Sequence, residues 1–110
     1  MAGINKVKRT TGSAVLAMSL TPEGPTSITS VKLHLSAAGG VTENFTVKIN
    51  SVVAAAYDTV LFSQDMNAVT DILWVPDQPI PIVTNDVVDF AYANTNSRTY
   101  GLEVTFKRES

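Results

Sequence analysis

Apolar and polar side chains alternate with a period of two along much of this chain, most clearly near its C-terminus. Val88, Phe90 and Tyr92 occupy every second position of one run, and residues 100–106 repeat the pattern. Successive side chains of a β-strand point to opposite faces of a sheet, so this period predicts strands that bury one face and expose the other. The alternation therefore favours an antiparallel β-protein with half-buried strands.

The two runs are joined by residues 94–97, Asn-Thr-Asn-Ser, which are turn-forming residue types. A short turn between two alternating runs is typical of a β-hairpin. We therefore expect residues 86–93 and 98–107 to pair as an antiparallel hairpin.

Similar patterns predict the other strands. They fall at residues 13–20, 27–36, 44–51, 57–65 and 70–75. Prolines confine residues 76–83 to a loop or a short edge strand, because proline cannot donate to a sheet ladder. Residues 52–56 are too few to nucleate a helix alone, so a loop or bulge is expected there. About eight short strands with frequent turns predict an all-β fold, an antiparallel β-sandwich or jelly roll.

A chain of 110 residues corresponds to one domain of ordinary size. Residues 1–12, rich in Gly, Thr and Lys, are expected to form an extended, mobile N-terminal arm, and residues 13–110 a single β-sandwich domain. The side chains expected to point into its core are Val31, Leu33, Leu35, Phe45, Val47, Ile49, Val60, Phe62, Ile72, Trp74, Val88, Phe90, Tyr92, Tyr100, Leu102, Val104 and Phe106.

Charge is distributed unevenly, although the net charge is only −2. Residues 1–22 carry three basic and no acidic side chains, whereas residues 23–110 carry five basic and ten acidic ones. A basic segment on an acidic body can attract an acidic partner, although an ordinary solvated terminus has the same composition. The lysines are not interleaved with aromatic residues and the body would repel phosphate, so no nucleic-acid partner is expected.

Residue types that carry chemistry are scarce. The absence of cysteine excludes disulfides, thiolate metal sites and cysteine nucleophiles. The single histidine, His34, is expected on the outer face of its strand, where a catalytic triad or zinc site would have to be built around it alone. The aspartates match no calcium loop, and Asp86 is expected to form a tight turn through its own side chain. We predict a non-enzymatic protein with no catalytic residues, cofactor, metal or small-molecule substrate.

An aromatic binding platform is the main alternative that the residues leave open. Trp74 with Tyr57 or Tyr92 could stack on a sugar, whereas a core role for Trp74 is the simpler interpretation. The apolar stretch at residues 14–20 is short and contains Ser19, which argues against a signal peptide. No run is long enough to span a bilayer, so no membrane partner is expected.

Several segments between about residues 28 and 106 resemble a family of small virion structural proteins of tailed bacteriophages. They are Glu43-Asn44-Phe45-Thr46-Val47, Ala56-Tyr57-Asp58-Thr59-Val60-Leu61, Trp74-Val75-Pro76-Asp77, Pro79-Ile80-Pro81, Asp86, Tyr92-Ala93-Asn94-Thr95-Asn96 and Thr99-Tyr100-Gly101-Leu102. The resemblance implies a β-sandwich carried on the particle, a capsid decoration (cement) protein assembled in the host cytoplasm. It also implies the major capsid protein and neighbouring copies as partners, the latter in a homotrimer. A tail- or fibre-associated module that recognises a host glycan or protein is the alternative.

The N-terminal segment is the expected contact with the capsid or a neighbouring subunit, because an extended arm can add a strand to an exposed sheet edge. Its apolar anchors would be Ile4, Leu16, Met18 and Leu20. Its charged contacts with an acidic surface would be Lys6, Lys8 and Arg9.

Overall fold

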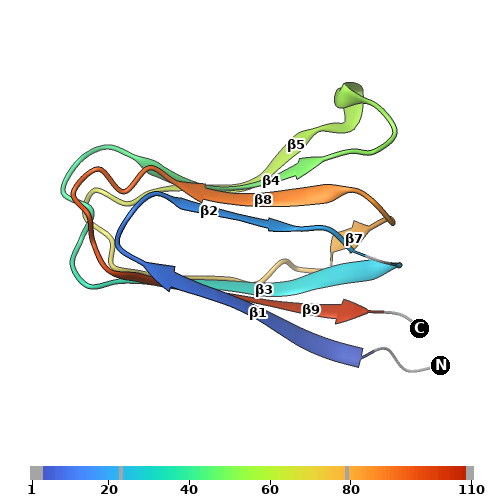
Figure 1. Ribbon diagram of the computed structural model, residues 1–110, viewed down its shortest axis with the longest axis horizontal. Coiled ribbons are helices and arrows are strands. Elements are labelled where there is room, and N and C mark those ends of the chain that lie inside the picture. The colour runs from blue at the N-terminus through green and yellow to red at the C-terminus, as the bar shows by residue number, and fades with distance from the viewer. Residues whose placement is uncertain (1–3, 23, 79, 109–110) are drawn as a thin grey trace.

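The computed structural model describes residues 4–22, 24–78 and 80–108, which form two antiparallel sheets packed face to face (Figure 1). The strands of this part of the chain are β1 (Ile4–Gly12), β2 (Leu16–Leu20), β3 (Thr26–Leu35), β4 (Asn44–Asn50), β5 (Thr59–Asp65), β6 (Asp71–Trp74), β7 (Ile80–Ile82), β8 (Val87–Tyr92) and β9 (Tyr100–Arg108), with one short 3-10 helix, η1 (Ala55–Tyr57). None of the helical structure in the described ranges is long and apolar enough to cross a membrane.

The strand order is that of a jelly roll. The first sheet has the order β1-β9-β3-β6, with β7 paired to β3, and the second sheet has the order β2-β8-β4-β5. Pairing is nested along the chain: β1 with β9, β2 with β8, β3 with β6 and β7, and β4 with β5. A long hairpin wrapped around a common core gives this order. The expected all-β sandwich of about eight strands is confirmed.

The expected hairpin of residues 86–93 and 98–107 is wrong. β8 lies in the second sheet between β2 and β4, whereas β9 lies in the first sheet between β1 and β3. Residues 94–97 do form a turn, closed by the Ser97 amide donating to the Asn94 carbonyl at 2.9 Å, but this turn carries the chain across the sandwich. Both strands face the same core from opposite sides, so their alternation is identical to that of a hairpin.

The described part of the expected arm belongs to the first sheet. Residues 4–12 are extended, as expected, but instead of projecting as a mobile arm they pair with β9 from Ile4 opposite Arg108 to Gly12 opposite Tyr100. Their alternation is weak because β1 is an edge strand with mostly exposed side chains. A strand that buries little of its surface gives no hydrophobic pattern that could place it in a sheet.

The core fills the space between the two sheets. Its buried apolar side chains in the described residues are Leu16, Met18, Leu20, Ile28, Val31, Leu33, Leu35, Phe45, Val47, Met66, Ile82, Val88, Phe90, Tyr92, Tyr100, Leu102 and Val104. Ile49, Phe62, Ile72, Trp74 and Phe106, also expected to point inward, are partly buried against this cluster. The alternation of the sequence therefore identified most of the core.

Val60 is the exception among the expected core residues, with 54% of its surface exposed. The pairing of β4 with β5 shifts register between two neighbouring pairs, Val47 with Phe62 and Lys48 with Val60. This bulge adds one residue to β5, and one extra residue reverses the face on which the following side chains lie. Val60 therefore shares the outer face with Lys48.

Asp86 forms the turn expected of it. Its side chain is 95% buried between β7 and β8, and its carboxylate accepts the Val83 amide at 3.3 Å. The same carboxylate accepts the Val52 amide at 2.8 Å, so it also fastens the base of the β4–β5 loop. One side chain thus connects two loops that lie far apart in the sequence.

Candidate interaction surfaces

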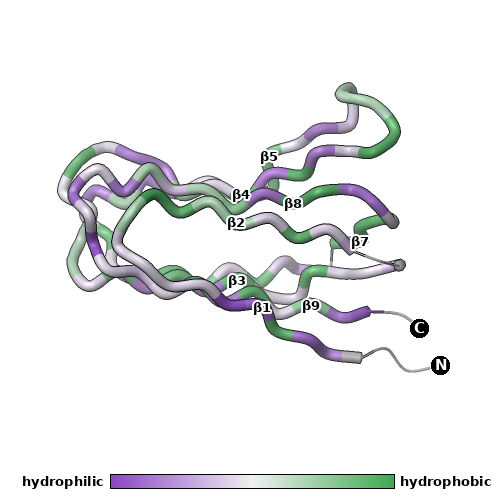
Figure 2. The backbone as a smooth tube through the Cα atoms, viewed as in Figure 1, coloured by the Kyte–Doolittle hydropathy of each residue, from purple (hydrophilic) through white to green (hydrophobic). Residues whose placement is uncertain are grey.

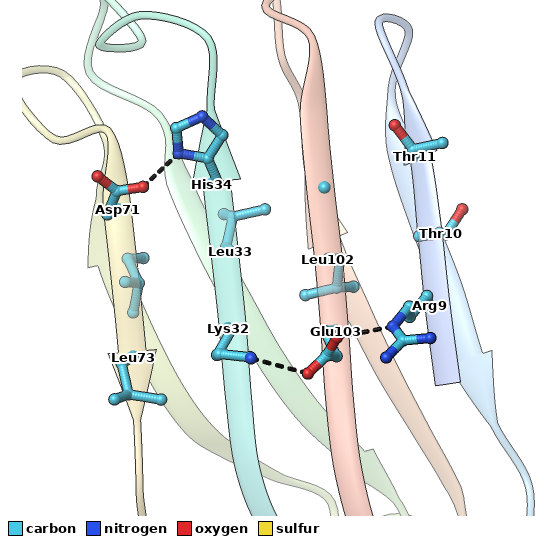
Figure 3. Close-up of a pocket in the computed structure, with 12 residues that line it drawn as sticks. Arg9, Thr10, Thr11, Lys32, Leu33, His34, Asp71, Leu73, Leu102 and Glu103 are labelled. Atoms are coloured by element: carbon cyan, nitrogen blue, oxygen red, sulfur yellow. Dashed lines mark hydrogen bonds and ion pairs between the residues drawn. The ribbon is translucent and has the colours of Figure 1, made fainter. Parts of the chain in front are cut away.

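An open depression of about 880 Å³ lies on the outer face of the first sheet, across β1, β9, β3 and β6 (Figure 3). Two rows of side chains cross the strands there, because residues in register on neighbouring strands lie side by side. One row runs Arg9, Glu103, Lys32, Leu73, and the other runs Thr11, Gly101, His34, Asp71.

Gly101 produces the hollow in the second row. It occupies the central strand β9 between Thr11 and His34, and a Cβ atom at Gly101 would meet nothing within 4 Å. A glycine within a strand leaves a gap on the sheet surface where another chain or ligand can approach the backbone. The depression is therefore formed by a missing side chain on a flat sheet, and it is open to solvent.

An ion-pair network occupies the first row. Glu103 accepts from Lys32 Nζ at 2.8 Å and from Arg9 Nε at 2.7 Å, so one carboxylate bridges β3, β9 and β1. The hydrogen bond from Lys32, followed by that from Arg9, lowers the pKa of Glu103 below its ordinary value. All three side chains keep contact with solvent, so the network orders the surface more than it stabilises the fold.

His34 and Asp71 are hydrogen-bonded through the imidazole Nδ1 and a carboxylate oxygen at one end of the second row (Figure 3). The hydrogen bond with His34 is the largest cause that lowers the pKa of Asp71. The Thr70 hydroxyl donates to Asp71 at 3.2 Å, and the Thr11 hydroxyl on β1 donates to the Tyr100 carbonyl at 2.7 Å, so both hydroxyls are already engaged. A histidine–aspartate pair on an open surface, with no nucleophile held against the imidazole in the described residues, gives no basis for assigning hydrolysis.

Metal binding finds no support in the described ranges. They contain no group of three or more His, Asp or Glu side chains arranged to hold an ion. Asp86 forms the expected turn, and Asp58 likewise binds nearby backbone, since it accepts the Ser51 amide at 2.7 Å.

The basic residues expected to make contacts lie on the outer edge of the first sheet. Lys6, Lys8 and Arg9 are all exposed on β1. Lys8 Nζ donates to the Ser19 carbonyl at 2.6 Å and so connects the edge strands β1 and β2 of the two sheets. Arg9 is held by Glu103, as described above. The edge therefore presents positive charge from a fixed strand.

The apolar residues expected to act as anchors need correction. Leu16, Met18 and Leu20 lie on β2 with 0%, 8% and 6% of their surfaces exposed, because they point into the sandwich. Their side chains are covered by this chain itself and cannot also contact a partner. Ile4 begins β1, and its side chain lies outside the described part of the structure.

The aromatic side chains of the alternative platform are separated. Tyr92 is buried in the core, and Trp74 is half-buried and stacks on Phe62 with ring centroids 5.3 Å apart. Tyr57 is 63% exposed and lies in η1. They do not form one exposed surface on which a sugar could stack.

One surface was missed in the sequence. The β4–β5 loop projects away from both sheets at the end of the molecule that also carries the chain termini (Figure 1). Residues 52–57, Val-Val-Ala-Ala-Ala-Tyr, are all exposed there, and Figure 2 shows hydrophobic residues along much of the loop. The signal in the sequence is an uninterrupted apolar run without strand alternation, and for residues 52–56 this run predicts no more than a loop or bulge.

Comparison with known proteins adds a likeness of fold. No protein-family model and no curated protein sequence matches the chain. Among solved structures, it is similar to a chain of the acidic stable capsid structure of Helicobacter pylori bacteriophage KHP30, with a TM-score of 0.66 and 16% sequence identity. The superposition covers 100% of this chain and 92% of that chain. At this level of identity the likeness establishes the shared fold.

Proposed function

We propose that this protein is a non-enzymatic structural component of a bacteriophage virion, and more specifically a capsid decoration (cement) protein. The observation that carries the proposal is the likeness to a chain of a phage capsid, which extends over nearly the whole length of both chains. Two chains that match end to end share a complete architecture. The phage-protein resemblance of segments between residues 28 and 106 independently supports the same class.

The architecture suits such a role. The interior of the sandwich is filled by side chains from both sheets, and the candidate sites all lie on its outer surfaces. A decoration protein needs a stable body and contact surfaces rather than an enclosed pocket. The body here is closed by a nested set of strand pairs, from β1 with β9 to β4 with β5.

The basic edge of β1 is the proposed contact with the major capsid protein. Lys6 and Arg9 are exposed on a strand whose backbone position is fixed by β9. Positive charges on a rigid edge would be attracted to an acidic capsid surface, and salt would weaken the attraction. Copies of the protein, as a homotrimer on the capsid exterior, would each repeat this contact.

The test is binding to capsids of the same phage assembled without this protein. Purified protein is mixed with the capsids and sedimented, and the bound copies are counted at low and raised salt. We expect saturable binding that falls with salt, and weaker binding for Lys6→Glu combined with Arg9→Glu. Lys48→Glu, at an exposed position on β4 of the other sheet, is the control for reversing a basic charge away from this edge and should leave binding unchanged. Sedimentation of capsids without bound protein would refute the decoration role.

A further inference from the structure

The β4–β5 loop exposes an apolar surface that the decoration role by itself does not explain. We define the loop surface as Val52, Val53, Ala54, Ala55, Ala56, Tyr57 and Val60. Val53 and Tyr57 are 71% and 63% exposed, and Val52 and Val60 are more than half exposed. Several consecutive exposed apolar residues are unfavourable in water unless they serve an interaction.

The loop surface is held in shape by polar groups at its base. Asp58 accepts the Ser51 amide at 2.7 Å, and Asp86 accepts the Val52 amide at 2.8 Å. The tip turns through η1, where the Tyr57 amide donates to the Ala54 carbonyl at 3.1 Å. Polar side chains therefore support the backbone from inside, while the apolar side chains point to solvent. A preformed surface loses little conformational entropy when it binds.

We propose that the loop surface is the contact between copies of this chain in solution. The inference rests on the proposed function only in taking neighbouring copies as partners. Residues 51–57 carry no charged side chain, and Asp58 next to them is engaged with Ser51. A charged residue at the symmetry axis of a contact between identical copies meets its own copy, and the loop surface has no charge that could cause this repulsion.

The apolar composition of the loop surface also argues against the capsid as the partner that it contacts. Permanent interfaces between subunits are more apolar than interfaces formed between separately stable partners. A decoration protein must stay dispersed until it reaches a capsid, and it can do so if its apolar loop is already covered by another copy. The charged edge of β1 would remain free for the later contact.

The first experiment measures mass in solution. Wild-type protein at micromolar concentration is expected to show the mass of two or more copies of the 11.8 kDa chain. Val53→Asp would place a charge in the contact and weaken association by ~10-fold or more, giving the monomer mass. Val15→Asp is the matched control, because Val15 is 65% exposed in the β1–β2 loop, and this loop lies at the opposite end of the sandwich (Figure 1). Both variants change exposed residues, and circular dichroism confirms that each is folded.

The second experiment places the contact directly. The natural chain contains no cysteine, so one introduced thiol reports a single position. After mild oxidation, Val53→Cys is expected to run as a disulfide-linked dimer on a non-reducing gel. Val15→Cys, treated in the same way, is expected to run as a monomer. A wild-type protein that is monomeric at all concentrations, or a Val53→Asp variant with unchanged mass, would overturn the inference.

Capsid binding separates this inference from the proposed function. If wild-type protein binds capsids but Val53→Asp keeps its oligomer mass, the inference fails and the decoration role stands. If Val53→Asp dissociates the oligomer and no form binds capsids, the inference stands and the decoration role fails. A Val53→Asp variant that remains oligomeric but loses capsid binding would assign the loop surface to the capsid and overturn the inference.

Discussion

Asn94 is the residue on which the crossing between the two sheets depends most directly. It is 97% buried and has a positive φ of 53°, a conformation that asparagine tolerates better than most residues. Its Nδ2 donates to the carbonyls of Ala14 and Arg98, both at 2.9 Å, and its Oδ1 accepts the Arg98 amide at 2.8 Å. One side chain therefore closes its own turn and connects it to the β1–β2 loop.

Replacement of Asn94 by alanine should destabilise the protein by about 1–3 kcal/mol, because three backbone groups lose their buried partner. Urea unfolding followed by tryptophan fluorescence would measure the loss. Asn67→Ala, at an exposed loop position, is the control and should change the free energy of unfolding by less than about 0.5 kcal/mol. Equal stabilities of the two variants would show that the Asn94 side chain is dispensable.

The same glycine-to-alanine substitution is expected to have opposite effects on stability at Gly39 and at Gly101. A Cβ at Gly39 would lie 2.5 Å from Tyr92 Oη and 2.8 Å from the Met66 carbonyl oxygen, whereas one at Gly101 would meet nothing. Gly39→Ala should therefore cost about 1–3 kcal/mol through overpacking. Gly101→Ala should be neutral or stabilise by about 0.5–1 kcal/mol, because glycine weakens a strand. Thermal and urea unfolding of both variants would measure the difference.

The Tyr92 hydroxyl is the atom against which a methyl group at Gly39 would pack most closely. It is buried without a hydrogen-bond partner in the described structure, and burial is the main cause that raises its pKa. Tyr92→Phe removes the atom closest to the added methyl group. It should recover part of the stability lost in Gly39→Ala, and the Met66 carbonyl should limit the recovery. No recovery at all would place the strain elsewhere.

At the scale of elements, the first sheet is joined across three strands by Glu103. Since its pKa is lowered from 4.5 in the folded state, its contribution to stability is present above that value. The contribution is lost as the pH falls through the lowered folded-state pKa, where Glu103 becomes protonated. Asp71, whose pKa is lowered by His34, acts in the same direction at one end of the depression.

Glu103→Gln should therefore lower the melting temperature at neutral pH, and the difference from wild type should shrink as the solution becomes more acidic than the lowered pKa. Raised salt should also reduce the difference, because the network is exposed. Melting curves across pH would measure it, with Asp77→Asn at an exposed loop position as control. A difference that stays constant from neutral to acidic pH would contradict a role for the charge.

The positions of the strands follow closely from local pattern. Residues 27–36 and 44–51 were expected as strands, and β3 and β4 lie within one residue of those limits. The bulge in β5 and the edge strand β1 were not predicted. A bulge is a property of two paired strands, and an exposed edge strand has no buried face to mark it in the sequence.

At the scale of the whole molecule, the nested pairing brings the chain ends together. Ile4 and Arg108 are register partners at the ends of β1 and β9, and both termini lie at the same end of the sandwich (Figure 1). β6 and β7 pair with different parts of β3, so the loop that joins them is not needed to hold either strand. The fold should therefore tolerate a change of chain order.

A circular permutant that joins Ser110 to Met1 by a short Gly-Ser linker and opens between Asp77 and Gln78 should fold. We expect a loss of no more than about 1 kcal/mol, a fall of about 4–8 °C in melting temperature. The control opens the chain inside β3, between Lys32 and Leu33, and should not fold because both neighbours of that strand lose their partner. Circular dichroism and thermal melting would distinguish the two permutants, and a first permutant that does not fold would contradict the prediction.

The sequence by itself determined that this protein is built of short antiparallel strands. It also determined where most of these strands lie and which side chains they bury, because the period of two is set by the local geometry of the backbone. It also identified Asp86 as a turn residue and left His34 exposed. Only the tertiary structure decided that β8 and β9 lie in opposite sheets, that Ile4–Gly12 forms an edge strand, and that Leu16, Met18 and Leu20 belong to the core. Strand partners are chosen by contacts between residues far apart in the chain, and the same alternation serves a hairpin and a crossing between sheets equally well.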